Sequence, residues 1–233
     1  QYRRPQISAF YRFETSPNSQ VELAAGAFRT IGNDLTPTFS LALGESADGA
    51  DDGTDAAIPS VQGRLDYQST IGSANVRLGF SGLYGKLKAE TNYGNSEEYE
   101  SYAGSAHLMV SFSNGIGVSG EAFMGSNLGS YFGGILNNNL IDGLEAQGGW
   151  ASAWFKLHKN VKVTGGYSFD DPLDEDLSLG QRARNQAIFG NIQFTPVSFV
   201  TAGIEVSQWE TEYLGVTDPV QNMRVETALI MNF

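Results

Sequence analysis

Apolar and polar residues alternate along much of the chain, and its last eleven residues show the pattern most clearly. In the segment 223–233 the alternate positions counted back from the end are mainly apolar and include Val225, Leu229 and Met231. The positions between them include Arg224 and Glu226. Successive side chains of a strand point to opposite faces, so this segment predicts a strand with one apolar and one polar face.

The same period of two marks further segments, which are joined alternately by short and by long connections. The expected strands are 6–13, 21–29, 36–44, 61–67, 74–84, 102–112, 116–124, 144–157, 161–169, 183–194, 199–211 and 223–233. Hairpins that cross a bilayer have short turns on one side and longer loops on the other, and roughly ten residues suffice for a tilted strand to cross. The sequence therefore predicts an all-β fold, a transmembrane antiparallel up-and-down β-barrel of about twelve strands, with residues 1–233 as a single domain.

Two features of this pattern need interpretation. Within 144–157 the alternation is ambiguous, because Trp150 and Trp154 oppose apolar neighbours, and a bulge would reconcile it. Aromatic residues also gather towards the strand ends, where a membrane interface would hold them as girdles. These aromatics are Tyr11, Tyr67, Tyr84, Tyr102, Trp150, Trp154, Tyr167, Phe169, Phe194, Phe199 and Trp209.

The composition excludes some classes of function and favours others. The net charge of -12 argues against a nucleic-acid partner, because binding phosphates requires a basic surface. No run of eighteen apolar residues is present, which argues against a transmembrane helix but not against a barrel. The 28 glycines and the many polar residues fit a barrel, in which only alternate strand residues meet lipid. No cofactor is expected.

The end of the chain resembles bacterial outer-membrane β-barrel proteins, whose last strand typically ends in an aromatic residue after alternating apolar ones. Phe233, Met231, Leu229 and Val225 match this pattern, while Thr227 departs from it. The resemblance implies an integral protein of the bacterial outer membrane, in contact with outer-membrane lipid and lipopolysaccharide. It also implies that the barrel-assembly machinery recognises the last strand.

In a bilayer, unpaired backbone groups cost several kcal/mol each, so the sheet must close on itself. We therefore expect the segment 6–13 to pair antiparallel with 223–233. The chain carries no signal peptide at Gln1, so it is mature, trimmed or truncated at its start. One alternative is that these residues are the barrel part of a longer protein.

The parity of the strands predicts which charged residues face the lumen. This set comprises Arg12, Glu22, Arg64, Asp66, Arg77, His107, Glu121, Lys162, Glu205, Arg224 and Glu226. Either these charges pair into a plug that stabilises a narrow barrel, or they line a water-filled path and select small polar solutes by size and charge.

A Gly- and Asn-rich connection, 125–143, contains apolar residues where a solvated loop would be polar. These residues are Leu128, Tyr131, Phe132, Ile135 and Leu136. Three arrangements are open: the loop folds inward and constricts the pore, it contacts a neighbouring subunit, or it forms a small apolar cluster of its own. The stretch resembles trimeric porins of the DcaP type, which implies a homotrimer and uptake of small acidic compounds.

Catalysis and metal binding are not expected. The chain has two histidines, His107 and His158, and no cysteine. Neither histidine has the neighbouring residues of an outer-membrane hydrolase site, and no G-x-S-x-G motif is present. The acidic segments 48–55 and 170–176 lack the spacing of a calcium-binding EF-hand loop. We interpret both histidines as hydrogen-bonded residues of the lumen or of a turn.

The sequence thus predicts an outer-membrane porin, a channel for passive diffusion of small hydrophilic solutes. The alternative is a non-conducting structural or adhesive barrel, whose acidic outer loops bind a partner.

Overall fold

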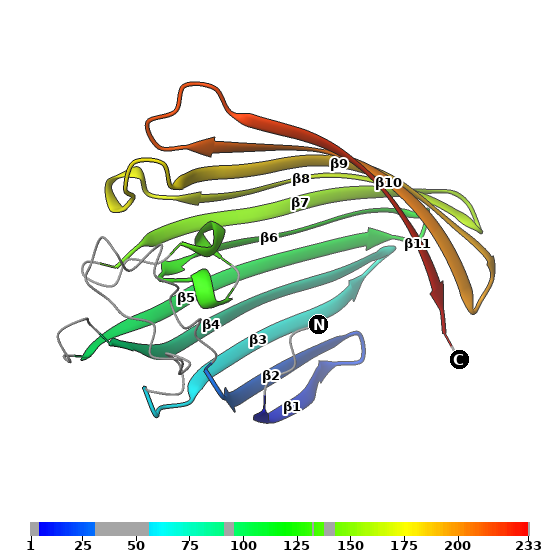
Figure 1. Ribbon diagram of the computed structural model, residues 1–233. Helices are drawn as coiled ribbons and strands as arrows, with labels where there is room; N and C mark the ends of the chain where they lie inside the picture. The colour runs from blue at the N-terminus through cyan, green and yellow to red at the C-terminus, as the bar shows by residue number, and fades with distance from the viewer. Residues whose placement is uncertain (1–4, 31–55, 91–95, 132, 138–142, 233) are drawn as a thin grey trace.

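The computed structural model describes residues 5–30, 56–90, 96–131, 133–137 and 143–232. Within these residues the chain forms one antiparallel sheet of eleven strands, each paired with its neighbours in sequence (Figure 1). The strands are β1 (Gln6–Ser16), β2 (Ser19–Phe28), β3 (Ser60–Ile71), β4 (Ala74–Glu90), β5 (Ser96–Phe112), β6 (Ile116–Ser126), β7 (Glu145–His158), β8 (Val161–Pro172), β9 (Arg182–Val197), β10 (Val200–Tyr213) and β11 (Val220–Met231). Three short 3-10 helices lie in the connections, η1 (Gly129–Tyr131), η2 (Gly134–Leu136) and η3 (Asp174–Asp176). The expected strand 36–44 lies outside the described residues.

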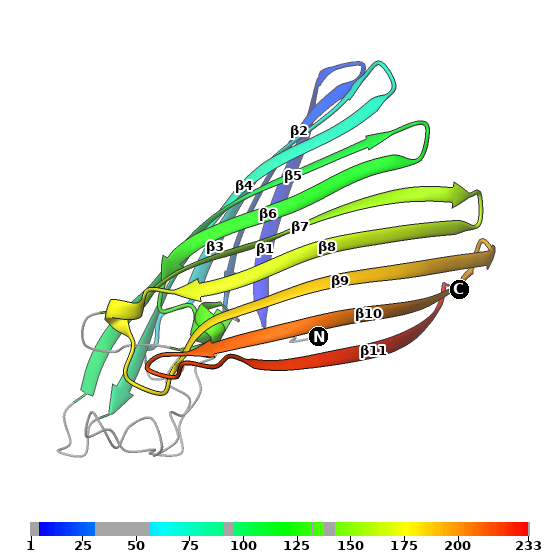
Figure 2. The same ribbon diagram turned by 90° about the horizontal axis from the view of Figure 1, so that it is seen from above.

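The hairpin turns gather at one end of the sheet and the long connections at the other (Figure 2). Two residues, Gly72 and Ser73, separate β3 from β4, and Gly72 has a φ of 59°. At the Asn114-Gly115 turn, Gly115 has a φ of 91° and its N–H donates to Phe112 O over 3.0 Å. Positive φ at these positions suits glycine, which has no Cβ to clash. The predicted alternation of short and long connections is confirmed.

The charged segment after Tyr84, expected as a loop, is instead an extension of two strands. β4 and β5 have 17 residues each and remain paired from Ala74↔Phe112 to Glu90↔Ser96. Alternation continues through this extension, since Leu87 and Tyr99 are paired and both are buried. On the opposite face Lys86 forms ion pairs with Glu98 and Glu100 across the hairpin, so these charges do not interrupt the strands.

The expected pairing of the first strand with the last is not observed. Among the described residues no ladder joins β1 to β11, and both strands are exposed along their whole length. The sheet is strongly curved, but its eleven strands do not complete the turn (Figures 1 and 2). Closure requires strand number and curvature to match, and alternation along single strands carries no information on that match.

The two faces of the sheet differ in character. We call the face that carries Glu22, Asp66 and His107 the inner face, since η1 and η2 fold over it. The fully buried side chains, such as Leu87, lie on this face or in the connection that covers it. The outer face carries apolar side chains such as Leu65, Phe80 and Leu229, and they are exposed. This contrast matches the two faces that the sequence predicts. The described part of the chain holds no helix long and apolar enough to cross a bilayer.

The register also resolves the ambiguity in β7. Trp150 is paired with Glu121, and Trp154 with Gly117, which places both indoles on the inner face. Ala151, Ala153 and Phe155 take the outer face. The only irregularity in this strand lies at its end, between Lys156 and His158, so no bulge is needed. Trp209 is paired with Ala187 on the inner face as well. The expectation that these tryptophans belong to an interfacial girdle is wrong, because the strand parity, not the position near a strand end, decides their direction.

Candidate functional site on the inner face

The strand register brings distant charged residues into one row. Arg12 is paired with Glu22, Glu22 with Asp66, and Asp66 with Gly79. The row continues from Gly79 to His107 and from His107 to Glu121. Neighbouring strands lie about 4.8 Å apart, so side chains in such a row are within reach of one another.

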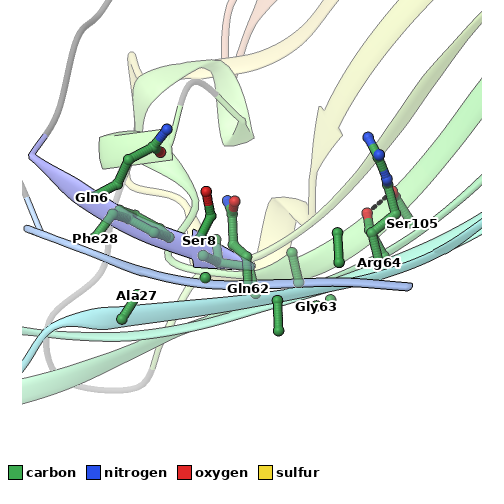
Figure 3. Close-up of a pocket in the computed structure, with 15 residues that line it drawn as sticks. Gln6, Ser8, Ala27, Phe28, Gln62, Gly63, Arg64 and Ser105 are labelled. Carbon is green, nitrogen blue, oxygen red and sulfur yellow. Dashed lines mark hydrogen bonds between the residues drawn. The ribbon is translucent and has the colours of Figure 1, made fainter. Parts of the chain in front are cut away.

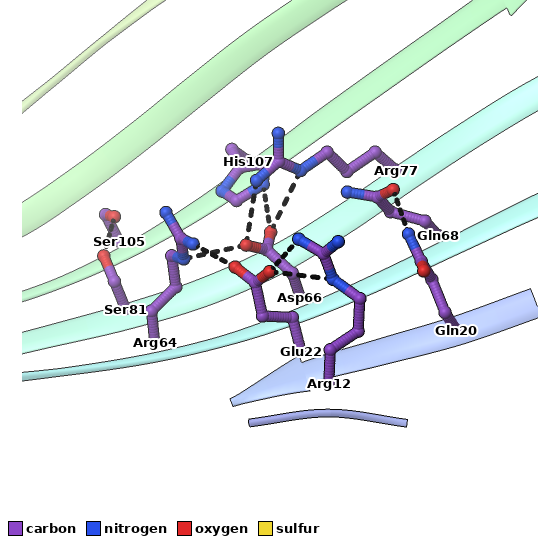
Figure 4. A network of polar contacts seen from close by, with 10 residues as sticks. All are labelled: Arg12, Gln20, Glu22, Arg64, Asp66, Gln68, Arg77, Ser81, Ser105 and His107. Carbon is purple, nitrogen blue, oxygen red and sulfur yellow. Dashed lines mark hydrogen bonds and ion pairs between the residues drawn. The ribbon is translucent and has the colours of Figure 1, made fainter. Parts of the chain in front are cut away.

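Six charged or titratable residues, some of them from this row, form a connected network on β1 to β5 (Figure 4). Glu22 accepts from the guanidinium groups of Arg12 and Arg64, each over 2.5 Å. Asp66 accepts from Arg64 Nε over 2.8 Å and from the Arg77 guanidinium over 2.9 Å. Its Oδ1 also lies 2.8 Å from His107 Nε2. We call this set, Arg12, Glu22, Arg64, Asp66, Arg77 and His107, the charged cluster.

The charged cluster requires a glycine, Gly79, that has no side chain to take part in the contacts. Gly79 lies between Asp66 and His107 in the row, so their side chains meet across β4. A Cβ at Gly79 would collide with the His107 ring and with Asp66 Oδ1. Only glycine leaves room for the contact between Asp66 and His107 across three strands.

The acids of the cluster lie beneath the bases. The side chains of Glu22 and Asp66 are 12% and 1% exposed, whereas those of Arg12, Arg64 and Arg77 are 57%, 42% and 34% exposed. Three guanidinium groups therefore reach solvent above two covered carboxylates. The resulting surface is positive although the whole chain is acidic.

The remaining predicted lumen residues share the inner face but lie outside the charged cluster. Glu121 accepts a hydrogen bond from Ser105 over 2.9 Å, and Glu205 accepts one from Asn191 over 3.0 Å. The Arg224 guanidinium lies 4.6 Å from the centre of the Trp209 ring. Two pairs in the register bring like charges together, Lys156 with Lys162 and Glu205 with Glu226.

Both histidines have hydrogen-bond partners. His107 contacts Asp66, and His158 Nδ1 accepts from Asn160 N in a turn over 3.4 Å.

The connection between β6 and β7 folds over the inner face. The Tyr131 hydroxyl and Ser60 Oγ on β3 lie 2.7 Å apart, and the Tyr131 ring packs edge-on against Phe28 of β2. On the other side, Asp170 Oδ2 on β8 accepts from Ile135 N over 3.1 Å. The segment from Gly134 to Leu136 has positive φ throughout; its Ile135 amide donates to β8, whereas its Leu136 amide donates to Gly133 O within the loop.

Of the apolar residues expected in this loop, Leu128 and Ile135 are buried, Tyr131 is half-buried and Leu136 is exposed. Phe132 lies outside the described residues.

A hollow of about 330 Å³ opens on the inner face of β1 to β5 (Figure 3). Gln6, Ser8 and Gln62 reach into it at one end, and Arg64 and Ser105 do so at the other. All five point to the side of the sheet on which the 3-10 helices lie. The hollow is therefore lined by polar and apolar residues, with an exposed guanidinium at one end.

The sequence analysis missed a second group of residues on the inner face. Phe123 on β6, Trp150 and Trp154 on β7 and Phe189 on β9 all point inward by register. Inward-facing glycines on neighbouring strands were the available signal, because a large ring needs a small partner beside it. We call β1 to β5 the charged half of the inner face and β6 to β10 the aromatic half.

No family model matches the sequence, and no curated protein matches it. The structure is similar to the outer membrane channel DcaP of Acinetobacter baumannii, with a TM-score of 0.72 and 14% identity. The match covers 99% of this chain and 62% of DcaP. At this identity the likeness shows the fold alone, the antiparallel β-sheet of an outer-membrane β-barrel. The predicted fold class and the resemblance to DcaP-type porins are thus confirmed at the level of the fold. A second similar structure, the CymD monoaromatic hydrocarbon channel, has a TM-score of 0.48 and 10% identity over 99% of this chain and 72% of CymD.

The chain spans 62% of the length of DcaP.

Proposed function

We propose that this chain forms the wall of a passive channel for small hydrophilic solutes in a bacterial outer membrane. The outer face would meet lipid, and β11, with Met223, Val225, Leu229 and Met231 on that face, would be the strand that the assembly machinery recognises. Lipopolysaccharide would surround the long connections. Channels of this architecture select by the charge and size of their lining, so the inner face determines what passes.

The charged cluster is the observation that carries the proposal. In an inert wall, opposite charges would neutralise one another at the surface. Here Glu22 and Asp66 are covered, and three arginines face the solvent above them. A positive surface on the wall of a pore attracts anions and repels cations, so we expect a modest preference for anions.

The loop over the inner face gives the channel its narrow part. Tyr131 ties this loop to β3 of the charged half, and Ile135 ties it to Asp170 of the aromatic half. A solute entering from the long connections would pass this loop before reaching the charged cluster. The loop thus limits size, and the cluster selects charge.

Single-channel recording in a planar bilayer tests the proposal. The wild type should conduct in KCl and show a reversal potential that favours chloride in a salt gradient. Arg64→Ala and Arg77→Ala should each shift that potential towards potassium, because each removes an exposed positive charge. Lys86→Gln, on the outer face of the β4–β5 extension, is the matched control and should leave it unchanged. If the wild type conducts and neither arginine substitution shifts the reversal potential, the proposed role of the cluster is refuted.

The alternative is a non-conducting barrel. The burial of Leu128 and Ile135 within the loop favours it, since a firmly packed loop can close the interior. Folded protein that inserts into the bilayer without any current would support this alternative and refute the channel.

A further inference from the structure

The aromatic half of the inner face presents a ring at successive levels along the strands. Phe123 is paired with Gly148, Trp150 with Glu121, and Trp154 with Gly117. Phe189 is paired with Gly166, which is itself paired with Ser152, so it lies at the level between the two tryptophans. With a rise of about 3.3 Å per residue, Trp150 and Trp154 are about 13 Å apart along β7.

Three of the rings lie against glycines. A Cβ at Gly117 would collide with the Trp154 indole, and one at Gly148 would collide with the Phe123 ring. A Cβ at Gly166 would likewise collide with the Phe189 ring. These rings lean over the neighbouring strand and are half-buried.

Trp150 is different from the other three. Its partners in the register are Glu121 and Ser168 rather than glycine, and it remains 43% exposed. An indole so exposed on a polar face has apolar surface available to a passing molecule.

Apart from its register partner Glu121, the inward-facing polar side chains near Trp150 on β7 and β8 carry neutral hydroxyl groups. Ser152 lies between the two tryptophans on β7, and its hydroxyl is 3.1 Å from that of Ser119. Ser168 and Thr164 face Trp150 and Trp154 from β8. Glu121 is the nearest acid in the row, and it already accepts from Ser105. Thus the stretch combines flat apolar surfaces with hydroxyl groups and, on β7 and β8 between these positions, no charge.

We propose that Trp150 is a stacking site for an uncharged, hydroxylated ring, the chemistry of a monosaccharide. A sugar ring has an apolar face of C–H groups, which packs on an aromatic ring, and equatorial hydroxyls, which reach groups such as Ser152 and Ser168. Binding sites for small molecules typically combine such an apolar surface with a few placed polar groups. This inference rests on the proposed channel function for its role in transport, because the ring would lie on the path of the solute.

Glucose and sorbitol separate ring stacking from hydroxyl binding. Sorbitol is the open-chain reduction product of glucose, so it keeps the hydroxyl groups but has no ring face. We compare the concentrations at which glucose and sorbitol reduce the KCl current of the wild type in a planar bilayer by the same fraction. The concentration of glucose should be about threefold lower, which is the gain in affinity that one modest aromatic contact predicts.

Trp150→Ala should abolish the difference between the two solutes, and Trp150→Tyr should retain part of it. Phe155→Ala is the matched control, since Phe155 lies on the outer face of the same strand and is also exposed. It should leave the difference unchanged. The KCl current of each variant, recorded before any solute is added, establishes that the variant has folded and inserted.

Equal effects of glucose and sorbitol on a conducting wild type would overturn the inference, as would a difference that survives Trp150→Ala. An effect of phenol without an effect of glucose would also overturn it, since the hydroxyl groups would then play no part. A wild type that does not conduct refutes the channel instead. In that case the tryptophan fluorescence of the folded protein in detergent still tests the site, because glucose and not sorbitol should change it.

Discussion

Both halves of the inner face place large side chains beside glycines, but these side chains are charged in one half and aromatic in the other. In the charged half, Gly79 leaves room for Asp66 and His107 to meet across a strand. In the aromatic half, Gly117 and Gly166 leave room for Trp154 and Phe189. In both halves a glycine that faces inward lies beside a large side chain of the next strand.

The halves differ in how rigidly the neighbouring group is held. Asp66 has ion pairs to Arg64 and Arg77 as well as its contact with His107, so it cannot move without breaking them. The six-membered ring of the Trp154 indole lies against Gly117, and rotation about the side-chain bonds of Trp154 can relieve the contact. A charged network on a sheet is therefore less tolerant of added volume than a row of aromatic rings.

The largest expected effect is that of Gly79→Ala. The new methyl group would collide with Asp66 and His107 together, and overpacking of this kind costs about 2 kcal/mol of the free energy of unfolding. Urea unfolding in detergent or lipid measures it. Gly82→Ala is the matched control on the outer face of the same strand, where the nearest atom to the new Cβ is Ala103 O at 3.6 Å. Equal unfolding midpoints for the two variants would contradict the expectation that a methyl group is tolerated less well at position 79 than at position 82.

The next largest effect concerns the loop that spans both halves. Asp170→Ala removes a charged acceptor for Ile135 N, which should weaken the closed position of the loop by about 1.5 kcal/mol. Tyr131→Phe removes only a neutral hydroxyl contact with Ser60 and should cost about 1 kcal/mol. The aromatic half would thus hold the loop more firmly than the charged half.

The rate at which a protease cleaves this loop in the folded protein measures both changes, because cleavage follows the open population. Tyr102→Phe is the control, since it removes a similar hydroxyl bond to Glu145 on the outer face. Faster cleavage in Tyr131→Phe than in Asp170→Ala would reverse the order that we expect.

Much of this arrangement follows from the sequence. Strand parity was sufficient to place Arg64, Asp66 and Arg77 on one face, because a period of two needs no knowledge of partners. Their contact was not predictable in the same way. It depends on which residues oppose one another across strands, and on a glycine at position 79 whose importance appears only once His107 is known to follow it in the row.

Two errors have physical causes of the same kind. The segment after Tyr84 was expected to be a loop because it is charged, yet Lys86 lies opposite Glu100 in the register and forms ion pairs with both Glu98 and Glu100 across the hairpin. Trp150 and Trp154 were expected at a membrane interface because they lie near strand ends. Cross-strand pairing keeps the charged segment in the sheet, and the register of β7, which alternation alone left ambiguous, sets the direction of the two tryptophans.

A smaller effect is expected for Gly117→Ala. The added methyl group meets the six-membered ring of the Trp154 indole, which can turn away about its side-chain bonds at a cost below about 1 kcal/mol. Urea unfolding, measured beside that of Gly79→Ala, checks this difference. If both variants lose the same stability, the aromatic half is as rigidly held as the charged half, and the contrast between them fails.

The smallest effect belongs to the ion pairs outside the inner face. Lys86 Nζ lies 3.5 Å from Glu98 and 3.7 Å from Glu100, and both acids are more than half exposed. Such pairs gain little, because water screens them and two long side chains must be held in place. Lys86→Gln should therefore leave the urea midpoint unchanged, whereas Arg77→Ala, which uncovers Asp66, should lower it. A loss of stability in Lys86→Gln comparable with that in Arg77→Ala would mean that charge pairing along the hairpin, rather than the covered cluster, stabilises β4 and β5.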